Sequence, residues 1–305
     1  MEIVIRGDSF EPIPEEERQP DEAVRPNITY WQDARRRFAE NIPAVISLGF
    51  IVAIVICAVV IPIIKPDYYS NHFEVANIPP NTVFWFGTDK FGRDIFTRIW
   101  FGARYSLTIA FTASFINFLI GVVYGGVAGF LGGKTDLIMM RFVDAIYSVP
   151  MVIYAILFIV FLGAGLQSII FAIAVSYWIP MARIVRGEIL QLKQQEFVLA
   201  ARALGAANKR IFLKHLLPNC MGQIIVTLTL LIPSAIFTEA FLSFIGLGIQ
   251  PPRASWGTLA SEGATYLRVA PYQLIAPALA ISVTILAFNL FGDGLRDALD
   301  PQMRK

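Results

Sequence analysis

Six apolar segments, each long enough to cross a lipid bilayer, constrain the fold of this chain more than any other feature. They lie at residues 44–64, 105–131, 137–162, 168–185, 221–246 and 272–292, where a transmembrane helix needs roughly 20 apolar residues. The fourth is the weakest, because it is short and holds Trp178 and Pro180. With 56% hydrophobic residues and a mean hydropathy of +0.60, the chain exceeds the usual range of soluble domains. The sequence therefore predicts an all-α polytopic membrane protein with six transmembrane helices.

The placement of Lys and Arg predicts how these helices are oriented. If both termini are cytoplasmic, 18 of the 25 basic residues lie inside and 7 outside, which is the expected bias. We expect a cytoplasmic tail at 1–43, a transmembrane domain at 44–292 and a cytoplasmic tail at 293–305. The first 28 or so residues are acidic and rich in proline, which predicts disorder. A short basic helix, WQDARRRFAEN, follows them, and no cleavable signal peptide is expected.

The segment GGVAGFLGGKTD, at 125–136, ends like a phosphate-binding loop but lacks the rest of that motif. Ala128 stands at the position of the first glycine, and an apolar span precedes the motif where a strand is required. A set of glycines instead recurs every fourth residue, at Gly121, Gly125, Gly129 and Gly133. On a helix they form a ridge that lets another helix approach closely. We predict helix packing here, then an inner turn at which Thr135 or Asp136 caps the next helix.

The longest interior loop, at 186–220, is the strongest candidate for a functional element. Residues 196–214, EFVLAARALGAANKRIFLK, mix apolar and basic side chains with a break at Gly205. Such a helix could lie flat on the lipid surface or dock on a soluble partner. Its five small residues favour docking modestly, because they allow it to seat deeply in a groove; they are Ala200, Ala201, Ala203, Ala206 and Ala207.

Part of this loop, LAARALGAANKRIFLKHLLP, resembles the coupling loop of ABC-importer permeases. The matching positions are Ala200, Ala201, Gly205, Leu217 and Pro218. Leu199 stands where these permeases usually carry glutamate, and His215 where isoleucine is common. The salt bridge of that glutamate with the ATPase is therefore not expected from position 199, although Glu196 lies one turn earlier.

Further segments extend the resemblance to the C-type permease subunit of oligopeptide/dipeptide ABC importers, from Trp31 to Pro301. They are WQDARRRF, FGTDKFGRDIFTRIWFGARYSL, GGKTDLIMMRFVDAIYSVP, MARIVRGEIL, FLSFIGLGIQPPRASWGTL and NLFGDGLRDALDP. The resemblance implies a type I ABC importer permease fold and import of oligopeptides across the bacterial inner membrane. Dipeptides, glutathione and nickel chelates stay open as cargo.

The same resemblance implies four partner subunits. They are a homologous B-type permease, two cytoplasmic ATPases that bind ATP and Mg, and an extracytoplasmic peptide-binding protein, while this chain itself binds no cofactor. The helix at 196–214 would move as a rigid lever when the ATPases close. The residues expected to contact the ATPases are Glu196, Ala200, Ala201, Arg202, Gly205, Lys209 and Arg210.

Polar residues inside the spans are candidates for the transport path, because charges in a bilayer are costly. Glu239 could line the path and bind a peptide amino terminus, or it could pair with the other permease, which we favour. Asn117, Thr227 and Thr238 are weaker candidates whose alternative is hydrogen bonding between helices. Arg141 and Asp144 are expected to form a local pair.

Two outer segments are expected to meet the binding protein. Residues 88–104 read as an amphipathic surface helix, with Ile95, Phe96, Ile99 and Trp100 toward lipid and Arg93, Asp94, Thr97 and Arg98 in water. In the loop PPRASWGTLASEG, the candidate contacts are Arg253, Ser255 and Trp256.

Other classes of protein have less support in the sequence. A net charge of +2 gives no argument for nucleic-acid binding, and the two cysteines and two histidines are too scattered for a metal site. A self-sufficient secondary transporter should often show related halves and broken helices, which are not visible here. A membrane-bound enzyme would need grouped catalytic residues, which are also not visible.

Overall fold

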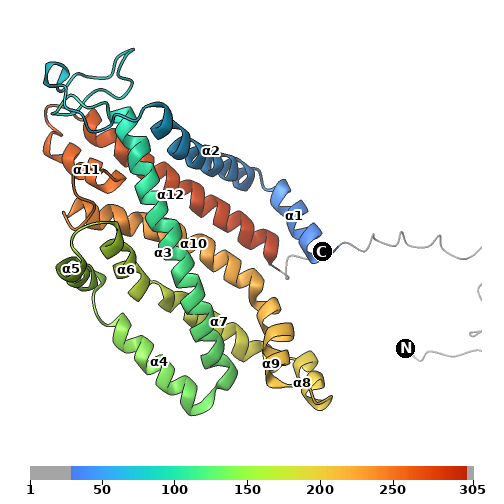
Figure 1. The fold of residues 1–305 in the computed structure, drawn as a ribbon. Coiled ribbons are helices and arrows are strands. Elements are labelled where there is room, and N and C mark those ends of the chain that lie inside the picture. The colour runs from blue at the N-terminus through green and yellow to red at the C-terminus, as the bar shows by residue number, and fades with distance from the viewer. Residues whose placement is uncertain (1–28, 301–305) are drawn as a thin grey trace, which may run out of the picture.

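The computed structural model describes residues 29–300, and every regular element in that range is helical (Figure 1). The helices before the central bundle are α1 (Tyr30–Glu40) and α2 (Ile42–Ile64), followed by a short turn, η2 (Phe73–Val75). The bundle then continues with α3 (Ile95–Leu131), α4 (Gly133–Tyr147), α5 (Met151–Leu162), α6 (Leu166–Ser176) and α7 (Trp178–Leu192). The remaining elements are α8 (Glu196–Ala203), α9 (Asn208–Arg210), the π-helical segment η3 (Ile211–Leu216), α10 (Leu217–Phe244), α11 (Trp256–Thr265) and α12 (Tyr272–Leu299).

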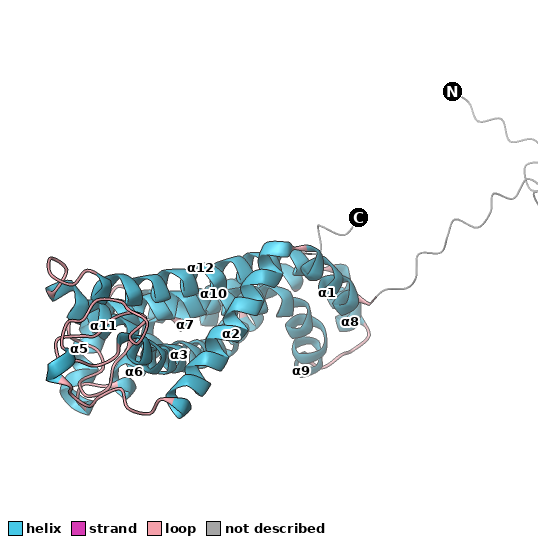
Figure 2. Ribbon diagram, turned by 90° about the horizontal axis from the view of Figure 1, so that it is seen from above, coloured by secondary structure: helices cyan, strands magenta, loops and turns pink. Residues whose placement is uncertain are grey.

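The molecule is elongated, with different elements at its two ends. One end carries α5, α11 and the loop after α2, and the other carries α8 and α9 (Figures 1 and 2). We call these the α11 end and the α8 end. Within residues 29–300, the helical stretches that are long and apolar enough to cross a membrane number five, at 42–64, 95–131, 166–192, 208–244 and 272–299. The bent pair α4 and α5 brings the number to as many as six.

Helix α3 forms the centre of the bundle and runs along its whole length (Figure 1). Its 37 residues span about 55 Å at 1.5 Å each, so it extends well beyond a hydrocarbon core of about 30 Å. The predicted separate surface helix at 88–104 is therefore wrong. Residues 95–104 continue straight into the second span, because Asp94 caps a helix that has no break before Gly132.

The third predicted span, 137–162, is also not continuous. Helices α4 and α5 meet at an angle of 77°, across residues 148–150. Pro150 explains the break, since proline has no backbone N–H and disfavours helical geometry in the residue before it. By contrast, Trp178 and Pro180 do not end the fourth span. They lie in the first turn of α7, where a proline costs no intrahelical hydrogen bond.

Three of the four ridge glycines lie against the backbone of α7. A Cβ atom would lie 2.8 Å from the Trp178 carbonyl oxygen at Gly121, 2.2 Å from that of Ala182 at Gly125, and 2.8 Å from that of Arg186 at Gly129. These distances leave no room for a side chain, so glycine fixes the spacing between α3 and α7. Gly133 is different: it has open space around it and a φ of +56°, and it begins α4 after the turn.

The predicted cap at Thr135 or Asp136 does not form. Gly132 precedes α4 without a side-chain cap. Asp136 instead receives two hydrogen bonds from the Arg186 guanidinium on α7, one of them at 2.6 Å from Nη2. The expected Arg141–Asp144 pair is present at 3.6 Å, and Arg183 of α7 lies closer to the same carboxylate, at 3.0 Å. Helix α4 is therefore joined to α7 by two ion pairs that the sequence did not indicate.

Within the described residues, both predicted tails contain helical structure that packs on the bundle. The basic segment forms α1, whose Tyr30 hydroxyl donates to the Leu299 carbonyl at 2.9 Å, so it packs on the end of α12. Helix α12 continues to Leu299, seven residues past the predicted end of the last span. The expected disorder before residue 28 lies outside the described residues.

Candidate functional site: an exposed helix at one end and buried polar groups in the bundle

The interior loop of the sequence folds into a short exposed helix seated on the bundle. Helix α8 has eight residues, and its Val198 is fully buried in a cluster with Ile211, Leu216 and Ile189. Ala201 is half-buried beside the same cluster. The opposite face is open, with Leu204 exposed to 88%. The helix is thus held by one side and presents the other to solvent.

The predicted single helix over 196–214 is wrong, because Gly205 ends α8. Gly205 has a φ of +78°, a conformation that glycine adopts without strain, and the Ala206 N–H donates to the Ala201 carbonyl at 3.0 Å. This is the pattern of a glycine-terminated helix. The chain then turns through α9 into η3 and α10. The segment is therefore a short helix followed by the first turns of a span, and not one rigid lever.

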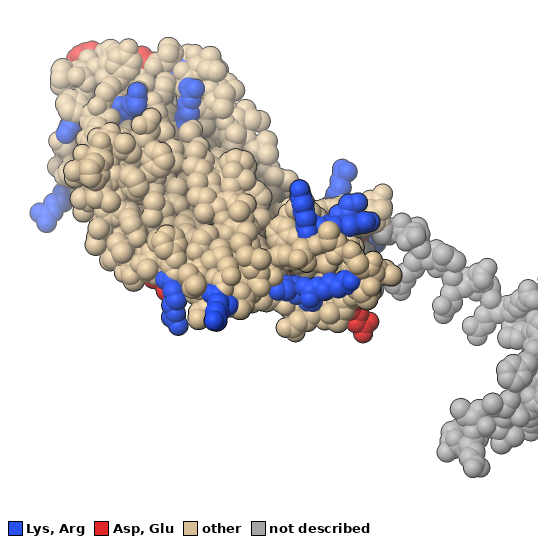
Figure 3. Space-filling view, turned by 60° about the horizontal axis from the view of Figure 1, so that its bottom comes forward, with Lys and Arg blue, Asp and Glu red and all other residues tan. Residues whose placement is uncertain are grey.

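The predicted coupling residues share this exposed surface. Six of them are exposed, namely Glu196, Ala200, Arg202, Gly205, Lys209 and Arg210, and Ala201 is half-buried. Figure 3 shows basic side chains on the lower and right-hand parts of this face and a further group at its upper left, with a few acidic side chains among them. An acidic or polar partner surface would complement this end.

Lys193 joins the base of this segment to the end of α3. Its ammonium group donates to the carbonyls of Phe130 at 2.6 Å and Gly129 at 3.2 Å, which the end of α3 leaves without helical partners. Burial, and then the positive charge of Arg202, lower the pKa of Lys193. Phe212 of η3 packs edge-on against Phe130 with ring centroids 5.5 Å apart. The start of the α8 segment and its exit are thus both anchored to α3.

Glu239 lies inside the chain and not on an open path. It is fully buried and accepts hydrogen bonds from Ser106 of α3 at 2.6 Å and from Ser243 at 2.7 Å. The Trp256 N–H of α11 donates to the same Ser106 hydroxyl at 3.2 Å. This carboxyl group therefore connects α3, α10 and α11, and its polar partners come from this chain.

The other proposed path residues are also buried, and the structure does not bring them to one surface. Thr227 donates to the Gln223 carbonyl at 2.8 Å, one turn earlier on its own helix. Thr238 contacts the Tyr177 hydroxyl. Asn117 is fully buried, and neither of its amide atoms has a hydrogen-bond partner among the described residues.

A buried ionic cluster occupies the α11 end, where the sequence suggested water-exposed charges. Arg98, with a side chain only 3% exposed, contacts Asp89 at 2.6 Å and Glu262 at 2.7 Å. Arg93, 8% exposed, contacts the same oxygen of Asp89 at 2.7 Å. The prediction that Arg93, Thr97 and Arg98 face water is wrong, because these carboxylates allow both guanidinium groups to be buried.

Two of the three predicted contacts for a binding protein are also buried. Ser255 caps α11 through Thr258, and the Trp256 indole donates to the Ile99 carbonyl at 3.0 Å. Both side chains are at most 1% exposed, so neither forms part of the surface described here. Arg253 is exposed, and its role stays a prediction.

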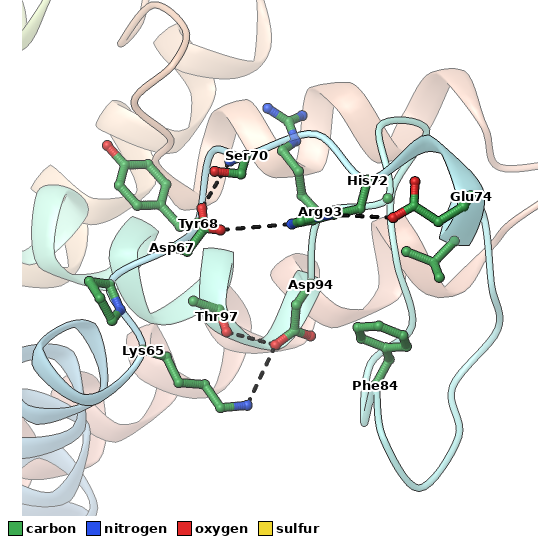
Figure 4. Close-up of a pocket in the computed structure, with 13 residues that line it drawn as sticks. Lys65, Asp67, Tyr68, Ser70, His72, Glu74, Phe84, Arg93, Asp94 and Thr97 are labelled. Atoms are coloured by element: carbon green, nitrogen blue, oxygen red, sulfur yellow. Dashed lines mark hydrogen bonds and ion pairs between the residues drawn. The ribbon is translucent and has the colours of Figure 1, made fainter.

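A polar pocket of about 500 Å³ lies beside the ionic cluster (Figure 4). His72 lies between Asp67 and Glu74, at 3.8 Å and 3.7 Å. Hydrogen bonds from Ser70 lower the pKa of Asp67. Lys65 and Asp94, 3.9 Å apart, lie in the same pocket. This mixture of charges suits a polar segment of another protein. Within residues 29–300, no three His, Cys, Asp or Glu side chains are grouped to hold a metal ion.

Comparisons of this chain with known proteins give consistent matches. The family model "Binding-protein-dependent transport system inner membrane component" matches residues 121–305, and the model "N-terminal TM domain of oligopeptide transport permease C" matches residues 29–80. The oligopeptide transport system permease protein OppC of Bacillus subtilis is 48% identical over 99% of both chains. The dipeptide transport system permease protein DppC of the same organism is 49% identical, over 95% of this chain and 92% of its own.

A more distant relative and a solved structure complete the comparison. The glutathione transport system permease protein GsiD of Escherichia coli is 39% identical over 94% of both chains. A chain from an inward-facing structure of the MetNI methionine ABC transporter superposes with a TM-score of 0.56, at 20% identity, over 65% of this chain and 94% of its own. At that identity the structural match supports the shared fold, which is that of a type I ABC importer permease.

Proposed function

The chain belongs to the family of binding-protein-dependent transport system inner membrane components, and we propose that it is the C-type permease of an ATP-driven peptide importer. The observation that carries the proposal is similarity over 99% of both chains to a permease named for oligopeptide transport. A permease named for dipeptide transport is equally similar. The sequence identities therefore support peptides as the class of cargo without separating oligopeptides from dipeptides. The segment WQDARRRF, which forms α1, resembles the oligopeptide branch and is the reason to place oligopeptides first.

In this proposal ATP and Mg²⁺ bind to two cytoplasmic ATPase subunits, and α8 docks on them. The exposed Ala200 supports this role, since a small residue lets a helix sit close to a partner. Closure of the ATPases pushes α8, and the buried contacts of Val198 with Ile211 and Leu216 pass the displacement into η3 and α10. The displacement is thus transmitted through buried side-chain contacts between α8 and η3, and not along one continuous helix.

The α8 end is cytoplasmic in the proposal, with both chain termini on the same side, because most of the basic residues lie there. The α11 end then faces outward and meets the peptide-binding protein through Arg253 and the pocket that holds Asp67 and Glu74. A homologous B-type permease completes the path, which opens when the two permeases move relative to each other.

Reconstitution tests the proposal directly. Proteoliposomes that contain this chain, its partner permease and both ATPases should take up labelled peptide only with ATP on the α8 side and loaded binding protein on the other. A parallel preparation contains this chain alone and a proton or sodium gradient. Uptake by the chain alone would show a secondary transporter and would overturn the proposal.

The docking role of α8 has its own test, with a matched control. Gly205→Ala and Gly133→Ala both place a side chain at positive φ, +78° and +56°, where no other atom lies within 4 Å. The backbone cost is similar, about 1–2 kcal/mol, but only Gly205 lies in the docking segment. We expect G205A to lower ATPase stimulation by loaded binding protein, and G133A to leave it near the unmodified level. Equal stimulation in the two variants would remove α8 as the docking helix.

A further inference from the structure

An apolar groove of about 520 Å³ lies between α2 and α12 in the half of the bundle nearest the α11 end. Phe50 and Ile54 of α2 form one wall, and Leu279 and Val283 of α12 form the other. The groove is deep at this point because Ala276 and Ala280, one turn apart on α12, have short side chains. Its volume falls within the range of about 300–1,000 Å³ that is typical of ligand sites.

The length of the groove matches one leaflet of a bilayer. Its lining on α12 runs from Tyr272 to Thr284, which is about 18 Å at 1.5 Å per residue. Half of a hydrocarbon core is about 15 Å. A single extended hydrocarbon chain fits this length.

The mouth of the groove has the character of a membrane interface. Phe86 and Trp100 line it, and the Phe96 ring lies 5.5 Å and 6.1 Å from them. Lys65, the first residue after α2, lies 5.7 Å from the same Phe96 ring; its side chain is exposed, and its ammonium group also lies 3.9 Å from the Asp94 carboxylate. Aromatic rings, and lysines at helix ends, are enriched where a membrane protein meets the lipid headgroups.

The groove is also continuous with an exposed apolar surface on α2. Helix α2 has only 28% of its most apolar window buried inside the chain, and Ile46, Ile56 and Ile63 are exposed by 66%, 55% and 70%. These side chains need an apolar environment outside the chain. The groove therefore opens onto a surface that requires an apolar environment, which the acyl chains of a bilayer supply.

We propose that one acyl chain of a glycerophospholipid, from the bilayer half at the α11 end, lies in the groove between α2 and α12. Its phosphate group lies near Lys65, and its terminal methyl lies near Phe50 and Val283. This site fills the space between the two helices with hydrocarbon and holds α2 against the bundle.

Photolabelling tests the site in the complete transporter in nanodiscs. Two phosphatidylethanolamine probes carry a diazirine, one near the ester and one near the end of the acyl chain. The first should label Phe86, Trp100 and Tyr272, and the second should label Phe50, Val283 and Thr284. Labelling without this order along the groove, or cross-links of these residues to the partner permease, would overturn the proposal.

A pair of variants supplies the matched control. Ala280 lines the groove, whereas Ala278, two residues away on the same helix and also half-buried, does not. We expect A280F to reduce groove labelling at least tenfold, and A278F to leave it unchanged. Equal labelling in both variants would refute the site. If A280F does not assemble, the order of labelling in the unmodified transporter still decides the question.

Discussion

The close approach of α3 and α7 leads to a prediction about Gly125→Ala. In the structure the new Cβ lies 2.2 Å from the Ala182 carbonyl oxygen and 2.9 Å from the Ala182 Cα. An ordinary contact starts at 3.4 Å, so the two helices must separate by about 1.2 Å at this point. Both contacting atoms belong to backbone, which cannot rotate away as a side chain can.

The expected cost follows from two opposing effects. Overpacking of this kind costs about 1–3 kcal/mol, while alanine is better than glycine inside a helix by about 0.5–1 kcal/mol. The net destabilisation is therefore about 0–2.5 kcal/mol, and the overlap with backbone atoms places it in the upper part of this range, near about 2 kcal/mol. Separation of the helices also pulls on the Asp136–Arg186 pair, which joins α7 to α4, the helix that directly follows α3.

Gly187→Ala is the matched control, because Gly187 lies within α7 and has no atom within 4 Å of the added Cβ. We expect it to be neutral or slightly stabilising. Thermal unfolding of the assembled transporter in nanodiscs should give G125A a lower Tm than the unmodified protein, and G187A an equal or higher one. Equal Tm values for the two variants would show that the helices are not in backbone contact and would refute the argument.

Three further substitutions test the buried polar contacts. Arg98→Leu should destabilise the fold by about 3–5 kcal/mol, because Asp89 and Glu262 are then left with one guanidinium group, that of Arg93, in place of two. Arg98→Lys should recover part of this in the same unfolding assay, and full stability of R98L would contradict burial of the cluster. Glu239→Ala should lower the free energy of unfolding by about 2–3 kcal/mol, because the Ser106 hydroxyl loses its buried acceptor, and E239Q should lower it less. Equal losses of stability in E239A and E239Q would assign the effect to packing and not to the hydrogen bonds. Lys193→Met should cost about 2 kcal/mol through loss of its hydrogen bonds to the end of α3, with Lys209→Met, at an exposed position, as the neutral control; equal stability of K193M and K209M would contradict it.

Most of the architecture could be predicted from the sequence, because it depends on local properties. Each span is a run of apolar residues, and a helix satisfies its backbone hydrogen bonds within that run. The close packing at Gly121, Gly125 and Gly129 was also visible, since a repeat of four residues puts them on one face. The exposed position of α8 followed from its mixture of alanine and basic residues.

The errors concern residues whose partners lie far away in the chain. Arg98 read as a water-facing charge because Glu262, its partner, is 164 residues away. Ser255 and Trp256 read as surface residues because the loop that holds them is polar, yet α11 folds them back onto α3. Glu239 had no partner nearby except Ser243 one turn later, and Ser106 comes from another helix.

The sequence by itself determined that this chain crosses a membrane, which segments are apolar enough to do so and which segment is exposed at one end of the bundle. These features follow from hydropathy and from glycine spacing, which are properties of neighbouring residues. Only the tertiary structure decided where α3 begins, how α4 and α5 bend, and which charges are buried. Those outcomes depend on the free energy of contacts between distant segments, because a charge enters the interior only when a partner from elsewhere in the chain compensates for its desolvation.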